Sequence, residues 1–468
     1  MPSLSHGFAK ALVLIAALSA MTRMPSVSQT APVTIRLAGD EWFLDSLTKT
    51  GLIPTYEQQS GVQVVVLHQN DQQIMATLDR APSAPEDDLD VIVVRHRWLG
   101  TLVQRGQVQP IDGFLADPNL HDPAFRPAQQ LFPEWWRELS SYGQSVYGFP
   151  YTALTTFLCY RKDLIADPEH QHKFRAQYHR ELKPPETWQE YLELAEFFNH
   201  PQENFYGTDI QGKQGLALWY EWLSFIYSFG GDILNTHHGW EYGDIVLNSP
   251  QNVAATTLYT KAIVFSPPDT LKYGWNEAQT AVQQGHVFMG VLWNDQAPFL
   301  EDPRISKVAG KIGYIQLPSG GPESFSHMDG LTYLITARSK HPREAYRFLE
   351  WLMSARVQIQ QTLSGSASIR ASTYEDGQVR ALPFTATFLA SIPEARHKPT
   401  IPESPQITQA SERQLYRIVS GQCSPQSGLD ELALDVQKIL GGNSRLRYPV
   451  KGAHQLGKST PTKRSDAP

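Results

Sequence analysis

Polar and aromatic side chains of this chain gather where strand-like segments end. Four apolar segments are each followed directly by acidic, basic, amide or indole side chains, at residues 40–42, 95–98, 293–295 and 327–329. Flat aromatic faces pack against the C–H faces of sugar rings, while carboxylates and amides form hydrogen bonds with pairs of hydroxyl groups. A single tryptophan of this kind fits a hydrophobic core, but four such ends in one chain favour a neutral ligand rich in hydroxyl groups.

Sequence signatures of covalent catalysis are largely missing. The chain has no G-x-S-x-G nucleophile elbow, no glycine-rich phosphate loop and no H-E-x-x-H zinc motif. Its two cysteines, Cys159 and Cys423, do not make a metal-type cluster. We therefore expect no cofactor, no metal and no catalytic residue. One enzymatic alternative stays open, because paired carboxylates such as Asp40 and Asp295 would suit a secreted glycoside hydrolase.

Length and composition predict a globular protein of two parts. The 468 residues exceed what one core usually holds, and 41% hydrophobic with 19% charged residues is an ordinary globular balance. The net charge of −7 argues against a nucleic-acid partner, which normally requires a basic protein surface. The two cysteines either form one disulfide or remain thiols.

The two ends of the chain suggest export and disorder. Lys10 precedes an apolar stretch over residues 11–20 that is too short to span a bilayer, so residues 1–30 are predicted to be a secretory signal peptide, with an uncleaved anchor as the alternative. No cysteine stands directly after that stretch, so we expect a periplasmic protein without a lipid anchor. Residues 442–468 are basic and lack apolar periodicity, which predicts a disordered tail, with a binding arm as the alternative.

Alternating strand and helix patterns predict an α/β architecture with mostly parallel sheets. Pro54 should kink or shorten the first helix, and Thr187 with Glu190 forms a capping box at the start of a later one. The expected strands are 33–39, 62–67, 89–94, 287–292, 311–318 and 329–340, and the expected helices are 44–59, 71–80, 187–199, 216–229, 249–264, 276–284, 341–363 and 427–440.

The order of these segments resembles the extracellular solute-binding proteins of bacterial ABC importers, the group that contains maltose-binding protein. The resemblance covers roughly residues 33–440, and its strongest marks, weak singly but quite specific in this order, are LDVIVVRHRWLGTLVQRGQVQPID, VYGFPY, PPETWQEYLELA, FGGDIL, GHVFMGVLWND and SKHPREAYRFLEWLMS. It implies a two-lobe periplasmic binding protein fold of type II. Each lobe would be a mostly parallel sheet flanked by helices, and the lobes would close on a ligand held in the cleft between them.

The resemblance also implies which residues bind the ligand. The strand that precedes Arg95 should end at the cleft, where Arg95, His96 and Arg97 depart from the small or acidic residues common in the family and would allow a ligand with an acidic group. The implied ligand-binding residues are Asp40, Glu41, Trp42, Arg95, His96, Tyr151, Trp219, Tyr220, Gly231, Trp293, Asn294, Asp295, Asp329 and Arg370.

Lobe boundaries, partners and function follow from the same resemblance. It implies a monomer that captures a mono- or disaccharide, polyol or glycoside and delivers it to the transmembrane permease of an ABC importer. Ligand sensing with a membrane receptor is an alternative that the sequence does not separate from transport. The N-terminal lobe is expected to comprise residues 31–150 plus 316–364 and the C-terminal lobe 151–315 plus 365–441, with crossing segments at 149–152, 312–318 and 364–372.

Overall fold

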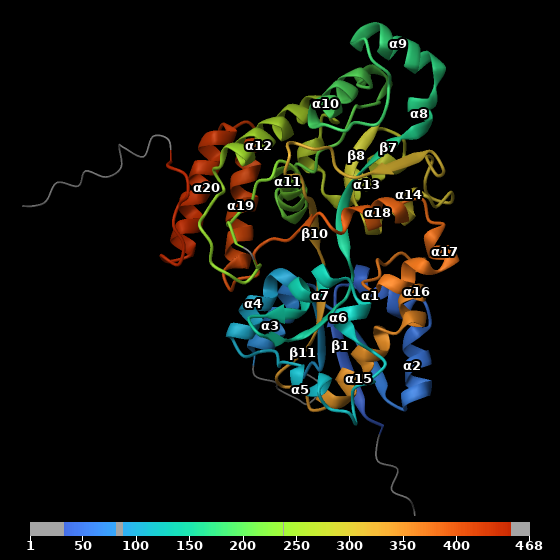
Figure 1. Ribbon diagram of the computed structural model, residues 1–468, viewed down its shortest axis with the longest axis vertical. Coiled ribbons are helices and arrows are strands. Elements are labelled where there is room, and N and C mark those ends of the chain that lie inside the picture. The colour runs from blue at the N-terminus through green and yellow to red at the C-terminus, as the bar shows by residue number, and fades with distance from the viewer. Residues whose placement is uncertain (1–31, 81–87, 237, 451–468) are drawn as a thin grey trace, which may run out of the picture.

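Two α/β lobes, one above the other, make up the protein (Figure 1). The computed structural model describes residues 32–80, 88–236 and 238–450, so the expected signal peptide and most of the expected tail lie outside the described residues. Within the described ranges, no helix has the length and apolar character needed to cross a membrane. The expected two-lobe α/β architecture is confirmed.

The first lobe is built on a five-stranded sheet with the order β2-β1-β3-β11-β6. β1, β2 and β3 run parallel, whereas β11 is antiparallel to both of its neighbours. The elements of this lobe are β1 (Thr34–Gly39), α1 (Glu41–Thr48), α2 (Leu52–Ser60), β2 (Gln63–His68), α3 (Asp71–Asp79), β3 (Val91–Arg95), η2 (His96–Trp98), α4 (Leu99–Gln104), α5 (Asp112–Leu115), α6 (Pro127–Gln130), α7 (Pro133–Ser140), the short hairpin β4 (Ser141–Tyr142) and β5 (Ser145–Val146), β6 (Gly148–Pro150), β11 (Leu331–Ile335), α15 (Pro342–Leu352) and α16 (Ala355–Leu363).

The central strands of this sheet are apolar on both faces because helices cover both. Leu37 and Val93 pack in the cluster that includes α1, α2 and α15, while Ile92 and Val94 pack in the cluster that includes α3 and α4. A strand covered on both faces has a continuous apolar sequence rather than an alternating one. This explains why the sequence of β3 is continuously apolar up to Arg95.

The single helix expected over residues 44–59 is two helices in the structure. Gly51 adopts φ 74°, a left-handed conformation that ends the helical path between α1 and α2. Pro54 then lies in the first turn of α2, where a missing backbone N–H removes no intrahelical hydrogen bond. The interruption therefore comes from the glycine and not from the proline.

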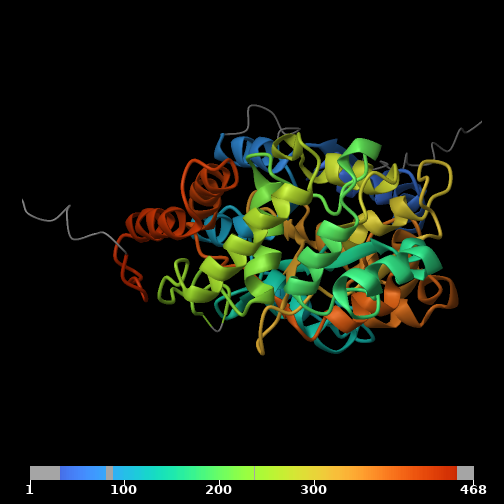
Figure 2. The same cartoon turned by 90° about the horizontal axis from the view of Figure 1, so that it is seen from above.

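The second lobe is built on a sheet with the order β12-β10-β7-β8, and β9 also pairs with β7. The expected capping box at Thr187 and Glu190 is present at the start of α10. In both views the last two long helices project from one side of this lobe (Figure 1, Figure 2). The elements are β7 (Leu154–Arg161), α8 (Lys162–Ala166), α9 (Pro168–Tyr178), α10 (Trp188–Phe197), α11 (Leu216–Ser228), α12 (Pro250–Ala262), α13 (Trp275–Gln283), β8 (Met289–Trp293), η6 (Asn294–Gln296), α14 (Ala297–Leu300), β9 (Ile312–Ile315), β10 (Ser326–Asp329), α17 (Gly377–Arg380), α18 (Thr385–Ser391), β12 (Ala395–Arg396), α19 (Ser404–Val419) and α20 (Pro425–Ile439).

Strand directions in the second sheet differ from the mostly parallel arrangement expected. β7 is antiparallel to β8, β9 and β10, and only β10 and β12 pair in parallel. The reason is the path of the chain, because β7 enters this lobe directly from β6 of the first lobe. It therefore runs away from the space between the lobes, while its neighbours run toward it.

Three segments connect the lobes. The first follows β6 at residues 151–153, the second is Gly330 between β10 and β11, and the third lies near Ala367, whose carbonyl accepts hydrogen bonds from Ala153 N at 3.0 Å and Thr152 Oγ1 at 2.9 Å. Residues 312–315, expected in a crossing segment, form β9 of the second sheet instead. The return to the first lobe thus comes later in the chain than expected, after β10.

A further segment, residues 397–403, leaves β12 and rests on the first lobe before α19 begins. Thr101 Oγ1 donates a hydrogen bond to Pro402 O at 2.8 Å, and His96 Nε2 lies 3.0 Å from Thr400 Oγ1. Gly100 faces the same backbone so closely that a Cβ at this position would overlap Thr400 and Ile401. We call residues 397–403 the docking segment.

The substitution Gly100→Ala is expected to displace the docking segment from α4. Forcing an extra methyl group against packed backbone typically costs about 1–3 kcal/mol, so the free energy of unfolding should fall by that amount in chemical denaturation. Gly113→Ala is the matched control, because nothing lies within 4 Å of a Cβ built at Gly113. Equal stability of the two variants would contradict the close contact.

Both cysteines are free thiols, which answers the question that the sequence left open. Cys159 is buried in β7 and donates to Gly290 O at 3.2 Å, whereas Cys423 is half-buried and precedes α20.

Candidate ligand-binding site

A cavity of about 230 Å³ lies between the lobes and is lined by both of them. Strand ends contribute much of its wall: Asp40 follows β1, Arg95 ends β3, Trp293 ends β8 and Asp329 ends β10. The ends of strands from two different sheets therefore meet at one space. The described residues that line the cavity are Asp40, Trp42, Phe43, Arg95, Leu154, Tyr220, Trp275, Asn276, Gln279, Trp293, Asp295, Gln296, Asp329, Gly330 and Leu331.

Aromatic rings form a large part of the wall. The rings of Tyr220 and Trp293 lie 6.0 Å apart at 70°. At the rim, Trp42 of the first lobe contacts Phe299 of the second, with ring centroids 5.2 Å apart. Flat rings on two sides of a small cavity suit a ligand with apolar C–H faces and polar edges.

The arginine at the end of β3 is held in place by a carboxylate of α3. Arg95 Nη1 lies 3.3 Å from Asp71 Oδ2, and Arg97 Nη2 lies 3.2 Å from the same oxygen. The Arg95 guanidinium also lies 5.5 Å from the ring centroid of Phe43 and 5.9 Å from that of Trp275. Asp71 offsets part of this positive charge, so Arg95 presents fixed N–H donors to the cavity.

The acidic residues of the cavity have different environments. Asp40 caps α1, where it accepts a hydrogen bond from Trp42 N at 3.1 Å. Burial raises the pKa of Asp295 to about 6, against the hydrogen bond from Trp42 and the charge of Arg95, which lower it. Asp329 lies 2.6 Å from the ammonium of Lys398. Although burial opposes ionisation, that ammonium holds the pKa of Asp329 well below its usual range.

Half of the implied site residues line this cavity. Tyr151 lines a neighbouring cavity of about 280 Å³, which shares Trp42, Phe43 and Asp295 with the first. The implied residues that line the first cavity are Asp40, Trp42, Arg95, Tyr220, Trp293, Asp295 and Asp329.

Six implied residues line neither cavity: Glu41, His96, Trp219, Gly231, Asn294 and Arg370. Asn294 instead fastens a crossing segment, because its side chain accepts from Thr155 N and donates to Ala153 O, each at 3.0 Å. Trp219 is adjacent to Tyr220 on α11 and so points about 100° away, into the core beside Trp222.

The other four also lie outside both cavities. Glu41 is exposed in the first turn of α1. Gly231 follows α11, where a Cβ would overlap the side chain of Asn252. Arg370 donates to Met353 O at 3.1 Å in the first lobe. His96 is buried beneath the cavity, between Thr400 and the ring of His397.

Several lining residues escaped the sequence analysis. Trp275, Asn276 and Gln279 lie in the first turns of α13, and the aromatic residue at the helix start was a usable signal. Gln296 belongs to η6, directly after the strand end that was recognised. Lys398, which pairs with Asp329, lies more than 60 positions further along the chain and carried no local signal.

One group of side chains beneath the cavity has ligand atoms suited to a metal. Nitrogen and oxygen atoms of His96, Asp329 and His397 all lie within 4.8 Å of one another. His397 Nε2 is 2.8 Å from His96 Nδ1, which is a hydrogen-bond distance between the two rings. The ammonium of Lys398 already neutralises Asp329 and would repel a second cation. We therefore interpret the group as a hydrogen-bonded network.

A small cavity between two α/β lobes, lined from both sides and spanned by crossing segments, is typical of proteins that bind a small ligand between their lobes. The chain belongs to the family of bacterial extracellular solute-binding proteins, whose model matches residues 51–387. The expected family is thereby confirmed. The hydrolase alternative finds no support in this family.

Known relatives share most of the length of the chain. A mannitol-binding protein of Pseudomonas aeruginosa is 26% identical over 408 residues, which are 82% of this chain and 87% of that protein. A solute-binding protein of an ABC transporter from Agrobacterium radiobacter K84, solved with ribitol, is 25% identical with a TM-score of 0.74, covering 87% of this chain and 98% of that one. A maltose-bound protein of T. maritima has a TM-score of 0.72 at 20% identity, covers 87% of this chain and 100% of its own, and shares the fold.

Proposed function

We propose that the protein is the substrate-binding component of an ABC importer for a carbohydrate or polyol. The observation that carries this proposal is the cavity between the lobes, where the rings of Tyr220, Trp275 and Trp293 accompany carboxylate and amide groups. A mono- or disaccharide, polyol or glycoside would place its C–H faces on the rings and its hydroxyl groups on Asp40, Asp295 and Asp329.

Binding would favour the closed arrangement of the lobes. Trp42 and Arg95 lie on the first lobe, and Trp293 lies on the second. A ligand that contacts all three therefore binds most tightly when the lobes are close together. The closed, loaded protein would then deliver the ligand chemically unchanged to the transmembrane permease. The ribitol and mannitol named for two relatives support this class of ligand.

Location and assembly belong to the same proposal. The protein would be exported by the N-terminal segment to the periplasm, would carry no lipid anchor and would act there as a monomer without catalysing a reaction. Membership of the family of bacterial extracellular solute-binding proteins supports this location.

The test is a ligand screen of the purified protein by thermal shift and tryptophan fluorescence. The panel should contain ribitol, D-mannitol, maltose, common monosaccharides and sugar acids, with amino acids as a contrasting set. A ligand at 100 times its Kd stabilises the protein by about 2.7 kcal/mol, which is readily measured. A selective hit that mass spectrometry recovers unchanged would support the proposal. A response only to amino acids, or hydrolysis of a hit, would overturn it.

A further inference from the structure

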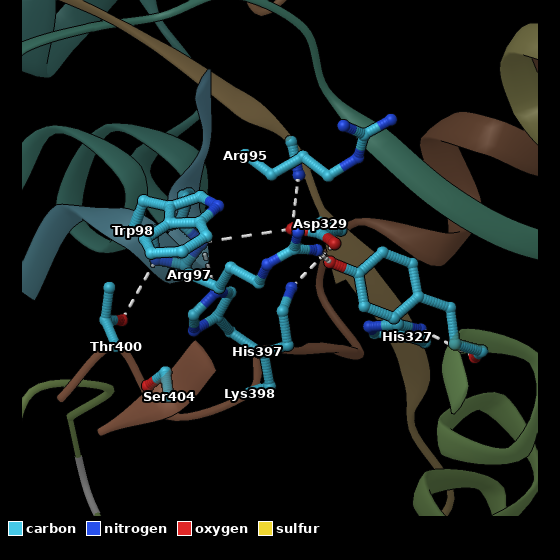
Figure 3. A network of polar contacts seen from close by, with 12 residues as sticks. Arg95, Arg97, Trp98, His327, Asp329, His397, Lys398, Thr400 and Ser404 are labelled. Carbon is cyan, nitrogen blue, oxygen red and sulfur yellow. Dashed lines mark hydrogen bonds and ion pairs between the residues drawn. The ribbon is translucent and has the colours of Figure 1, made fainter. Parts of the chain in front are cut away.

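A lysine is buried directly beneath the candidate site. Lys398 belongs to the docking segment and is only 2% exposed. Its ammonium lies 2.6 Å from Asp329 Oδ2 and 4.6 Å from the ring centroid of Tyr220, and both of these residues line the cavity. Figure 3 shows the side chain reaching from the docking segment up to Asp329. A positive charge from one part of the chain is thus placed against the cavity wall.

This ion pair has an effect beyond stability. Taking two charges out of water costs several kcal/mol per ion, and their attraction only roughly offsets that cost, so a buried pair contributes little net stability. Its definite consequence is electrostatic. Without Lys398, burial would favour the neutral form of Asp329, whereas with Lys398 the carboxylate stays ionised.

Asp329 keeps capacity for a ligand. Its Oδ1 accepts from Gly330 N at 2.8 Å and its Oδ2 faces Lys398. An ionised carboxylate has about four acceptor positions, so these contacts leave room for ligand hydroxyl groups in the cavity that Asp329 lines.

Other groups near Asp329 do not replace the lysine. His96 Nδ1 lies 3.9 Å from Asp329 Oδ1. Burial is the largest cause that lowers the pKa of His96, His327 and His397; the charge of Lys398 lowers these pKa values further, whereas Asp329 raises them. These imidazoles are therefore neutral near pH 7. Farther charges also act here: Arg95 and Arg97 lower the pKa of Lys398, and Glu138 raises that of His96.

We propose that Lys398 is a positioning residue for ligand binding. It holds Asp329 ionised and oriented, so that Asp329 accepts hydrogen bonds from the ligand. Because Lys398 already neutralises this carboxylate, Asp329 can accept hydrogen bonds from ligand hydroxyl groups and requires no positive charge on the ligand. This inference rests on the proposed function.

The test compares ligand affinity across pH in the wild type and in Lys398→Met, which keeps most of the length of the unbranched side chain but removes its charge. Calorimetric titrations from pH 5.5 to 8.5, with D-mannitol and with ribitol, give for each polyol the ratio of the variant's Kd to the wild-type Kd. Taking the ratio cancels the titration of Asp295, which both proteins share. In the variant, burial raises the pKa of Asp329, so affinity should be lower by tenfold or more at pH 5.5, on the order of one hydrogen bond to a charged group. The loss should shrink as pH rises.

Two further variants separate positioning from a structural role. Asp329→Asn/Lys398→Met buries no unpaired charge and so is suited to fold; it should bind weakly, with a Kd ratio that does not vary with pH. Lys340→Met is the matched control, since the exposed Lys340 pairs with the buried Asp88 at 3.0 Å and lines neither interlobe cavity, so its loss should leave affinity unchanged.

The outcomes distinguish this inference from the proposed function. If the wild type binds the polyols and the Lys398→Met ratio stays near one at every pH, Lys398 is merely structural and the inference is overturned alone. A double variant that binds like the wild type overturns it equally. If the wild type binds no sugar or polyol of the panel, the proposed function fails and this inference fails with it.

Discussion

Replacing Trp293 by alanine should weaken the binding of a sugar or polyol by about 100-fold, through the loss of a stacking face and its buried area. Trp293 ends β8, lines the cavity and is 7% exposed. Its ring also contacts Tyr220 and His327, with centroids 6.0 Å and 5.0 Å away, so its removal loosens the neighbouring aromatic wall as well. Calorimetric titration with the best ligand of the screen measures the effect.

A second tryptophan provides the control for this change. Trp351 on α15 is half-buried, donates to Gln59 Oε1 at 3.0 Å and lines neither interlobe cavity. Trp351→Ala should alter the unfolding midpoint but not the Kd. Unchanged affinity in a folded Trp293→Ala protein would place the ligand elsewhere.

Glu221→Gln should make the second lobe more stable at pH 8 and reduce its dependence on pH. Glu221 on α11 is 2% exposed, and its carboxylate accepts from Gln211 N at 2.7 Å and from Tyr259 OH at 2.5 Å. Burial outweighs these hydrogen bonds and raises its pKa to about 7. The protein therefore holds a proton that the unfolded chain has already lost.

The sign and size of the effect follow from this difference in proton binding. Since the folded state binds more protons than the unfolded state between about pH 4.5 and 7, stability falls as pH rises through that window and levels off above it. The raised pKa of Glu221 corresponds to on the order of 3 kcal/mol, which the amide of glutamine avoids. Burial, and then the charge of Glu221, also raises the pKa of Asp209 well above its usual range. Part of the dependence of the free energy of unfolding on pH should therefore remain in the variant.

Urea denaturation of both proteins at pH 5 and pH 8 gives the measurement. The variant should lose less free energy of unfolding between the two pH values than the wild type does. Glu375→Gln, at an exposed carboxylate, should leave the slope as it is. If Glu221→Gln were no more stable than the wild type at pH 8, the carboxylate would be ionised without cost and the raised pKa would be refuted.

Local sequence patterns determined most of the elements and the class of protein. The strands before Asp40, Arg95 and Trp293 were recognisable because apolar runs covered on both faces stand out, and the capping box at Thr187 placed the start of α10 within one residue. The same patterns located the polar strand ends. Six residues of these strand ends line one cavity, together with Tyr220, which the family resemblance implied.

The tertiary structure alone decided which neighbours along the chain face that cavity. Tyr220 lines it while Trp219 packs in the core, and Asp295 lines it while Asn294 fastens a crossing segment. Adjacent residues on helical turns point in different directions, and their type does not say which way. Sequence pattern also could not give the direction of the second sheet, because the path of the chain between the lobes sets it.

Contacts distant in sequence were beyond any local pattern. Lys398 meets Asp329 across 69 positions and His96 meets His397 across 301, in each case because the docking segment is folded against the base of the cavity. Residue types therefore predicted what the site contains, whereas the packing of the two lobes determines which groups are charged and toward what they are turned.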